Sequence, residues 1–145
     1  MATVRNILAK KGDAVHSVEA DHTVLDAAKL MNERRVGALV VVRGHKVIGI
    51  FTERDILNRI VAQQRDPAAT KVEDVMTAPV ECISPDAGRA ECRHIMREKR
   101  IRHLPVVENE RLVGIISIGD IVEDEGAAQQ ETIRHLYKYM DIEWK

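Results

Sequence analysis

Two short stretches of the sequence carry the same set of side chains with chemical potential. Residues 49–55 read Gly-Ile-Phe-Thr-Glu-Arg-Asp, which places a hydroxyl three residues before a carboxylate. Residues 114–120 repeat this frame 65 positions later, with Ser117 in the place of Thr52. Each stretch follows a β-rich run and precedes a run of helical character, so hydroxyl and carboxylate face each other across a first helical turn.

This pairing has two chemical interpretations. In the first, Thr52 and Ser117 are helix N-caps, and Asp55 and Asp120 complete a capping box. In the second, each aspartate binds two ribose hydroxyls, while the hydroxyl and free backbone N–H groups bind phosphate. A single copy favours capping, and two copies in fixed register require a further test.

The repeat extends well beyond these motifs. Residues 15–58 align with residues 80–123 without a gap, which indicates one structural unit used twice. Arg35 and Arg100 fall at equivalent positions on charged helix faces that we expect to be solvated. Other identical pairs include Asp21/Asp86, Met31/Met96, Leu39/Leu104, Val41/Val106, Gly49/Gly114 and Asp55/Asp120.

The first unit is expected to run strand, helix, strand, strand, helix. Val24, Ala27, Ala28 and Met31 have the spacing of one helical face, with Asp21 as the N-cap. The expected elements are a helical lead-in at 3–11, a strand at 16–18, that helix, hairpin strands at 39–42 and 46–50, and a helix from 52 to 62.

The second unit follows a polar linker at 63–70 and repeats this order. We expect the apolar face of its first helix to carry Ala90, Ile95 and Met96, with Cys92 at the margin. Its other expected features are a strand at 80–83, a helix start at 84–86, and hairpin strands at 104–107 and 111–115.

Residues 125–126 (Glu-Gly) are expected to separate the second unit from a C-terminal tail. Ile133, Leu136, Tyr137 and Met140 of this tail share a helical face. We expect that face to pack back on the domain or to dock against another subunit.

Each unit is too small to hold a core of its own, so burial favours two units with a shared core. The predicted fold class is α+β, with two β-α-β-β-α repeats related by a pseudo-twofold axis, the sheets packed together and the helices outside. The expected divisions are 1–66 for the lead-in and first repeat, 67–125 for the second repeat, and 126–145 for an amphipathic helix.

Composition excludes several classes of function. A net charge of −1 in 145 residues gives no general attraction to nucleic acid or to an anionic membrane. No apolar run reaches the ~18 residues of a membrane span, and no signal-peptide core is present, so we expect a cytoplasmic protein. Cys82 and Cys92 lack the spacing of a metal site and are expected to be reduced thiols.

The sequence resembles a tandem pair of cystathionine-β-synthase (CBS) domains, called a Bateman module, over residues 4–125. In the first repeat the similar motifs are Asp-x-Thr-Val-x-x-Ala-x-x-x-Met at 21–31 and Gly-Ile-Phe-Thr-x-x-Asp at 49–55. In the second they are Val-Met-Thr-x-Pro-Val at 75–80, Arg-His-Leu-Pro-Val-Val at 102–107 and Gly-Ile-Ile-Ser-x-x-Asp at 114–120.

The resemblance implies a non-enzymatic regulatory module that binds an adenosine-containing ligand in two clefts between its halves. AMP is the first expected ligand, with ADP, ATP, NAD or S-adenosylmethionine as alternatives, and no catalytic cofactor or metal is expected. The resemblance implies a first site of Thr52, Arg54, Asp55, Thr77, Pro79, Glu81 and Ile101. It implies a second site of Lys11, His16, Val36, Ala38, Arg102, His103, Ser117, Gly119 and Asp120.

The two expected sites are not equivalent. Arg54, which can bind phosphate with two hydrogen bonds, has Gly119 as its counterpart in the second repeat. The charge of Arg102 and His103 has no counterpart at residues 37–38, which are Gly-Ala. We therefore expect different ligand preferences in the two clefts.

Two other functions are weighed against this one. An enzyme would need a base, nucleophile or metal in a cleft, and the six histidines show no metal-binding spacing. A purely structural dimerisation module with unoccupied clefts would use the motifs only as caps. The expected assembly is a homodimer that acts on an effector protein in trans, whose identity the sequence does not give.

Overall fold

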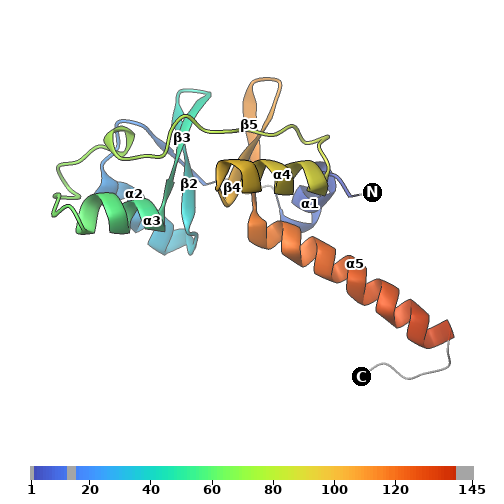
Figure 1. The fold of residues 1–145 in the computed structure, drawn as a ribbon. Helices are drawn as coiled ribbons and strands as arrows, with labels where there is room; N and C mark the ends of the chain where they lie inside the picture. Colours follow the sequence, from blue (N-terminus) through green and yellow to red (C-terminus); the bar gives the residue numbers. More distant parts are fainter. Residues whose placement is uncertain (1, 13–15, 140–145) are drawn as a thin grey trace.

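In this computed structural model the described residues are 2–12 and 16–139. They form two lobes of mixed helix and strand that lie side by side (Figure 1). Lobe 1 contains β1 (Ser17–Glu19), α2 (Val24–Arg34), β2 (Ala38–Arg43), β3 (Lys46–Thr52), α3 (Glu53–Asp55), the π-helix η1 (Ile56–Val61) and the 3₁₀ helix η2 (Val72–Asp74). Lobe 2 contains α1 (Val4–Lys11), α4 (Arg89–Lys99), β4 (His103–Glu108), β5 (Arg111–Ser117) and α5 (Ile118–Tyr139).

The sheet of lobe 1 has the order β1-β2-β3, with β1 parallel to β2 and β2 antiparallel to β3. Strand β2 is an almost continuous apolar run because both of its faces are covered, and five of its six residues are buried. The predicted hairpins are confirmed in both lobes, since β4 and β5 pair antiparallel in the same register as β2 and β3. The α+β class is confirmed with them.

The predicted strand at 80–83 is wrong. Only Ile83 pairs with lobe 2, as an isolated parallel bridge to Val106. Its N–H donates to the carbonyl of Pro105 at 2.9 Å, and its carbonyl accepts from the N–H of Val107 at 3.0 Å. The sheet of lobe 2 therefore has two strands, where that of lobe 1 has three.

Two prolines explain this shortened pairing. In lobe 1 the N–H groups of Val40 and Ala20 donate across the β1–β2 pairing at 3.1 and 3.0 Å. Their counterparts 65 positions later are Pro105 and Pro85, which have no N–H. The ladder in lobe 2 therefore lacks a donor on each side of its single bridge.

The helix starts also differ from the prediction. Thr23 caps α2 by accepting from the N–H of Asp26 at 3.1 Å, whereas Asp21, the predicted N-cap, lies in the preceding turn. In lobe 2 the equivalent cap is Gly88, and residues 84–86 precede the helix instead of opening it. A side chain can cap a helix only from the residue that directly precedes it, and Asp21 is two residues too early.

The buried face of α4 is centred on Cys92 and Met96, which are 0% and 4% exposed. The prediction that placed Cys92 at the margin and Ala90 on the buried face is wrong, because Ala90 is exposed. Both cysteines are free thiols. Burial raises the pKa of Cys92 to about 11, so this thiol stays protonated at neutral pH.

The two repeats do not share one core, contrary to the prediction. Each lobe has its own cluster of buried apolar side chains, and each cluster is completed by the segment that precedes the other repeat. Val4, Ile7 and Leu8 of α1 enter the core of lobe 2, while Val72 and Val75 enter the core of lobe 1. We call these two segments, residues 4–11 and 72–77, the lead-ins.

Both lead-ins dock through equivalent backbone hydrogen bonds. The first two N–H groups of α1 donate to the carbonyls of Ala87 and Pro85, and the first two of η2 donate to those of His22 and Ala20. All four bonds measure 2.8 to 3.1 Å. The lead-ins therefore cross between the lobes in a symmetric way, which couples the folding of the two repeats.

A glycine in each repeat makes room for the crossing lead-in. A Cβ at Gly114 would lie 2.7 Å from both methyl carbons of Leu8. A Cβ at Gly49 would lie 2.5 Å from the sulfur of Met76 and 2.9 Å from the carbonyl oxygen of Thr77. The repeated glycine of the two motifs is thus a site of close packing.

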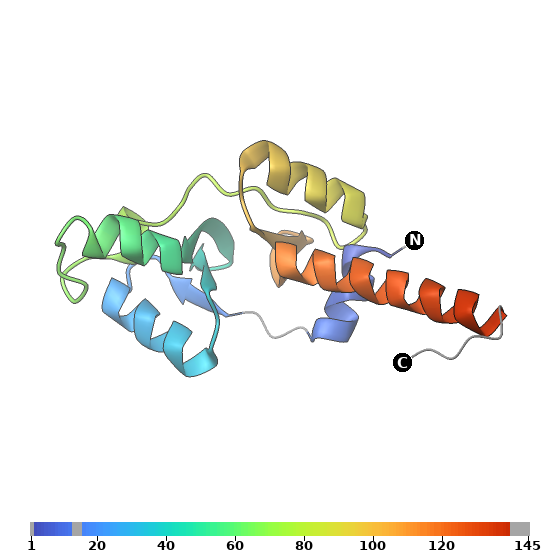
Figure 2. The same ribbon diagram turned by 60° about the horizontal axis from the view of Figure 1, so that its bottom comes forward.

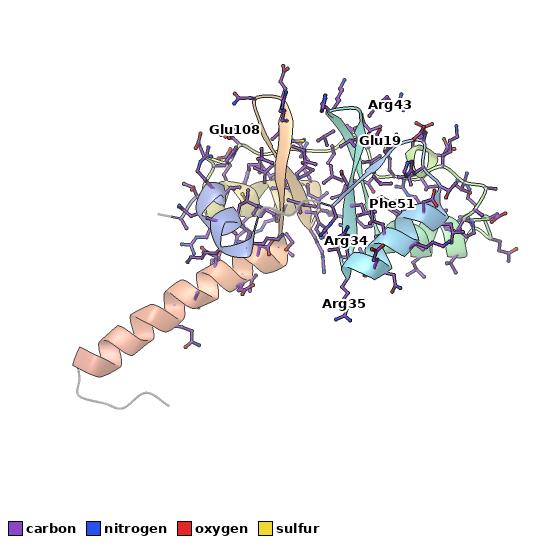
Figure 3. The ribbon with its side chains drawn as sticks, turned by 180° about the vertical axis from the view of Figure 1, so that it is seen from behind. Glu19, Arg34, Arg35, Arg43, Phe51 and Glu108 are labelled. Carbon is purple, nitrogen blue, oxygen red and sulfur yellow. The ribbon has the colours of Figure 1, made fainter. Side chains whose placement is uncertain are left out.

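Each lead-in also forms an ion pair with the β-hairpin that it meets. Arg5 of α1 pairs with Glu108, and Glu73 of η2 pairs with Arg43 at 2.6 Å. Figure 3 shows Arg43 and Glu108 on the two hairpins, which stand next to each other. The two pairs occupy equivalent places but have opposite polarity.

Helix α5 is continuous through Gly126, so one helix joins the end of the second repeat to the C-terminal segment. Two ion pairs hold its second turn against α4, Arg89 to Asp124 at 3.0 Å and Arg93 to Glu125 at 2.5 Å. The later turns extend beyond lobe 2 (Figures 1 and 2). The predicted stripe of Ile133, Leu136, Tyr137 and Met140 lies outside the residues whose side chains are described.

Candidate functional site

The hydroxyl and carboxylate of the first motif form a complete capping box. The N–H of Asp55 donates to Oγ1 of Thr52 at 3.2 Å, and the N–H of Thr52 donates to Oδ2 of Asp55 at 3.0 Å. The second motif repeats this geometry, with Asp120 N–H to Ser117 Oγ at 3.1 Å and Ser117 N–H to Asp120 Oδ2 at 2.8 Å. The capping interpretation is confirmed in both repeats.

The other oxygen of Asp55 faces the crossing lead-in. The hydroxyl of Thr77 donates to Oδ1 at 3.0 Å, and Nε of Arg59 lies 3.7 Å from the same oxygen. Nη1 of Arg59 also donates to the carbonyls of Val75 and Met76 at 3.1 and 2.8 Å. Arg59 therefore connects Asp55 to the lead-in. Asp55 itself is nearly buried, at 6% exposed.

Asp120 has a different partner. Nζ of Lys11, at the end of α1, donates to Oδ2 of Asp120 at 2.7 Å and to the carbonyl of Ile115 at 2.9 Å. Partial burial acts to raise the pKa of Asp120, but the bonds from Lys11 and Ser117 outweigh it and lower that pKa below its ordinary value. The carboxylate is therefore ionised at neutral pH.

Capping leaves each carboxylate with capacity for a ligand. An ionised carboxylate offers about four acceptor sites. The capping box uses Oδ2 in both residues, and Oδ1 of Asp120 accepts no hydrogen bond from the residues whose side chains the structure describes (2–12, 16–127, 129 and 130). Helix capping and the binding of a sugar hydroxyl are therefore compatible in one residue.

A cleft of about 500 Å³ lies between the lobes, beside the first motif. This volume falls in the range of small-molecule sites, about 300–1,000 Å³. Both repeats line it, and most of the lining side chains are polar or charged. The lining residues are Gly37, Ile50, Thr52, Glu53, Arg54, Asp55, Thr77, Arg100, Ile101, Arg102 and His103.

Charged residues of both motifs act on the pKa of His103. Burial lowers its pKa, and so do the positive charges of Lys11 and Arg102, while the carboxylates of Asp120 and Glu53 act in the opposite sense. The net effect is a pKa below the ordinary value of 6.5. His103 is therefore neutral at pH 7 and gains a proton readily only when an anion comes close.

Five of the seven residues expected at the first site line this cleft: Thr52, Arg54, Asp55, Thr77 and Ile101. The other two, Pro79 and Glu81, do not. Pro79 follows a cis peptide bond after Ala78, and Glu81 lies 3.6 Å from the ammonium group of Lys99. The ligand role of all seven stays a prediction.

The residues expected at the second site are divided. Lys11, Ser117 and Asp120 lie together, with Gly119 adjacent in the first turn of α5, near Oγ of Ser117. The pocket beside them, about 340 Å³, is lined by residues of α1 and α5: Ile7, Lys10, Lys11, Asp120, Glu123, Asp124 and Ala127.

The remaining members of the second expected site belong to lobe 1 or to the cleft of Asp55. The carbonyl of His16 accepts from β2, Ala38 pairs with Thr52 between β2 and β3, and Val36 packs on the core of lobe 1. Arg102 and His103 line the cleft that contains Asp55. Their ligand roles also stay predictions.

Sequence reasoning missed two charged residues of this region. Arg59 lies four residues after Asp55, a spacing that places the two side chains together on a helix and could have revealed the contact. Arg100 is exposed, as expected, but it also lines the cleft, at a residue where the chain turns sharply. No local pattern signals that turn.

A protein-family model described as "CBS domain" matches residues 4–62 and 72–125 of this chain. The chain belongs to the CBS domain family. The two matches correspond to the two repeats, so the resemblance to a tandem CBS pair is confirmed. A CBS pair is typically a regulatory module that binds a ligand, and CBS domains commonly bind adenosine-containing ligands.

Curated relatives cover most of the chain. A CBS domain-containing protein of Arabidopsis thaliana, named CBSX3 and mitochondrial, is 35% identical over 147 residues, which cover 95% of this chain and 71% of that protein. The CBS domain-containing protein YhcV of Bacillus subtilis (strain 168) is 35% identical over 111 residues, covering 77% and 79%. These names state no enzymatic activity.

Solved structures of CBS proteins share the fold. A protein with CBS domains from Burkholderia ambifaria MC40-6 is 44% identical with a TM-score of 0.83, covering 88% of this chain and 96% of that chain. A hexameric CBS-CP12 protein from bloom-forming cyanobacteria is 29% identical with a TM-score of 0.75, covering 94% and 88%. Among the described residues of the present chain, no helix is both long and apolar enough to span a bilayer.

Proposed function

We propose that this CBS pair is a regulatory module that binds an adenosine-containing ligand in the cleft between its lobes. The observation that carries the proposal is the juxtaposition of a nearly buried carboxylate, Asp55, with cationic side chains from both lobes in a cleft of about 500 Å³. A ribose with a phosphate needs this combination of acceptor and cations.

The ligand would lie with its ribose at Oδ1 of Asp55 and its phosphate toward Arg54 and Arg102. A ribose hydroxyl can replace the Thr77 hydroxyl at Oδ1, since the capping bond to Thr52 uses Oδ2. Adenine would pack on the apolar side chains of Ile50 and Ile101, which line the same cleft.

Regulation would follow from the crossing lead-ins. A ligand shifts a conformational equilibrium only by its differential affinity for two states. Thr77 and Arg59 join Asp55 to the lead-in that completes the core of lobe 1, so a ligand that replaces these contacts changes how lobe 1 holds the lead-in. An effector protein in trans would read that change.

Binding is tested by titration calorimetry and thermal shift with AMP, ADP, ATP, NAD and S-adenosylmethionine. A ligand at about 100 times its Kd should stabilise the protein by about 2.7 kcal/mol. Asp55→Asn keeps the side-chain shape but removes the charge, and it should abolish or strongly weaken binding. The matched variant Asp120→Asn makes the same change in the other repeat and should affect the Asp55 cleft far less.

If no adenosine compound shifts the melting temperature, the rival reading, a structural dimerisation module, is favoured. The capping boxes support the structural alternative, because both carboxylates already accept hydrogen bonds at helix N-termini. Equal effects of Asp55→Asn and Asp120→Asn on every ligand would contradict the placement of the ligand beside Asp55.

We also propose a homodimer formed through the last helices of the two repeats. Leu57, Val61 and Val122 are 60%, 62% and 53% exposed, and Leu57 and Val122 are equivalent positions of the repeat. Such exposed apolar side chains on two adjacent lobes favour burial against another subunit. Light scattering should give a dimer that Leu57→Glu with Val122→Glu dissociates, whereas Arg65→Glu, at an exposed position past the end of the π-helix, should leave it intact.

A further inference from the structure

Three guanidinium groups from separate elements meet in the cleft of Asp55. Arg54 lies in α3, Arg100 ends α4, and Arg102 precedes β4. Among the residues whose side chains the structure describes (2–12, 16–127, 129 and 130), none of the three forms an ion pair or a side-chain hydrogen bond. The cleft therefore collects cations that no protein acceptor satisfies.

The acidic side chains of the cleft do not cancel this charge. Asp55 has its own cation in Arg59, at 3.7 Å. Glu53 is the other carboxylate of the lining, and it lies against Gly37, where an added Cβ would be 3.3 Å from its Cδ. The lining therefore holds three arginines and His103 against a single carboxylate other than Asp55, that of Glu53.

The backbone of Arg100 is held in an unfavourable conformation. Its φ of 55° and ψ of 45° are those of the left-handed region at the C-cap of α4, where glycine is the usual residue. Any side chain other than glycine is disfavoured there. The left-handed backbone at this arginine therefore costs some folding stability, and the same residue lines the cleft.

Arg35 provides an internal comparison. It is the equivalent residue of the first repeat, with φ of 57° and ψ of 45° at the C-cap of α2. Both arginines are exposed, but Arg35 does not line the cleft of Asp55, and Figure 3 shows its side chain directed away from the end of α2. The two arginines share a backbone conformation but not a location.

We propose that Arg100 is the residue that selects ligands with two or more phosphates, with Arg54 and Arg102 as its partners. The proposal rests on the proposed function, because it takes the adenosine cleft as its site. A single phosphate carries a charge of about −1.5 to −2 at pH 7, which is less than the combined charge of three guanidinium groups, and each further phosphate adds acceptor oxygens for charge-assisted bonds. A third guanidinium finds its acceptor on a second or third phosphate.

The variants Arg100→Gly and Arg35→Gly test this assignment by titration calorimetry with adenosine, AMP, ADP, ATP and inorganic tripolyphosphate. Both variants relieve the same left-handed residue, so both should melt at or above the wild-type temperature. Arg100→Gly should weaken ADP, ATP and tripolyphosphate about 10-fold or more, change AMP by less than about 3-fold and leave adenosine unchanged. Arg35→Gly should leave all five unchanged.

Arg100→Lys separates charge from geometry. It keeps the positive charge and the strained backbone but lacks the planar fork, so its affinity for ATP should fall between those of the wild type and Arg100→Gly. Equal affinities of Arg100→Gly and Arg35→Gly for ATP would overturn the inference. An equal loss of AMP and ATP in Arg100→Gly would overturn it as well, because selection by phosphate number would then be absent.

The outcomes also separate this inference from the proposed function. If the wild type binds tripolyphosphate but no adenosine compound, and Arg100→Gly loses that binding, the adenosine site fails while the phosphate selectivity of Arg100 stands. If ATP binds and only Asp55→Asn reduces its affinity, the function stands and the role of Arg100 is refuted. Absence of binding for all five probes refutes both.

Discussion

Replacing Gly49 with alanine should disturb the contact by which one repeat receives the lead-in of the other. The added Cβ would lie 2.5 Å from the sulfur of Met76 and 2.9 Å from the carbonyl oxygen of Thr77. The sulfur can move by rotation of a flexible side chain. The carbonyl cannot move as easily, because it accepts a hydrogen bond from the N–H of Ile50 at 3.0 Å while the N–H of Thr77 donates back at 2.8 Å.

The expected cost is that of overpacking a well-filled interior, about 1–3 kcal/mol. For a chain of 145 residues each kcal/mol corresponds to about 2–4 °C, so the melting temperature should fall by roughly 2–12 °C. Met76→Ala in the Gly49→Ala background should recover part of this loss, because it removes the sulfur but leaves the carbonyl of Thr77 in place. A double-mutant cycle measures that coupling.

Gly126→Ala is the matched control, since it makes the same chemical change with the opposite expected sign. An added Cβ at Gly126 meets no atom within 4 Å, and the residue lies inside the continuous helix α5. Alanine should therefore stabilise the protein by up to about 1 kcal/mol. If Gly49→Ala melts with the wild type, or if Met76→Ala makes the Gly49→Ala protein still less stable than the two separate losses combined, the packing argument is refuted.

Three further predictions concern charged residues near the clefts. Lys11→Met should cost about 1 kcal/mol at pH 7. Because Lys11 lowers the pKa of Asp120, the stability that Lys11 supplies is present above the ordinary carboxyl pKa of 3.8 and is lost as pH falls through the lowered pKa. Urea titrations of the variant and the wild type should therefore converge in acid. Burial lowers the pKa of His103, so the unfolded chain takes up the proton first and the free energy of unfolding should drop as pH falls below 6.5. His103→Gln should flatten this part of the stability profile. An unchanged profile would refute the role of His103. Arg59→Met removes the cation beside Asp55 and the donor to two backbone carbonyls, so it should cost roughly 1–3 kcal/mol in denaturant unfolding. A loss below a few tenths of a kcal/mol would show that water replaces the guanidinium.

Local patterns were sufficient for the elements whose residues satisfy one another within a repeat. The hairpins follow from short apolar runs around a turn, and α2 and α4 follow from the 3.6-residue spacing that places Met31 and Met96 on buried faces. The capping boxes of Asp55 and Asp120 follow from a hydroxyl three residues before a carboxylate.

Features that depend on partners distant in the sequence were not predictable in this way. The strand expected at 80–83 was lost because Pro85 and Pro105 remove donors from both sides of one ladder, and neither proline lies inside the predicted strand. The crossing of the lead-ins is set by packing of Leu8 against Gly114, 106 positions apart. Short-range spacing contains no information on such a contact.

The cleft shows the same division. Thr52, Arg54 and Asp55 were found from one motif because the chain positions them in a single turn, and the structure groups them in one cleft. Arg100 was missed because it reaches the cleft only through the left-handed turn after α4. That turn is closed by the N–H of Ile101, which donates to the carbonyl of Met96 at 2.9 Å, and it lacks the glycine that would have signalled it.

The opposite polarity of the two lead-in ion pairs favours the lobe that each lead-in already reaches by packing. If α1 met the hairpin of its own repeat, Arg5 would face Arg43, and if η2 met the hairpin of its own repeat, Glu73 would face Glu108. Like charges therefore penalise the uncrossed chain path, whereas nothing in this pattern distinguishes a lead-in from the same lead-in of a neighbouring copy. At high concentration the same recognition would permit two chains to exchange their N-terminal helices.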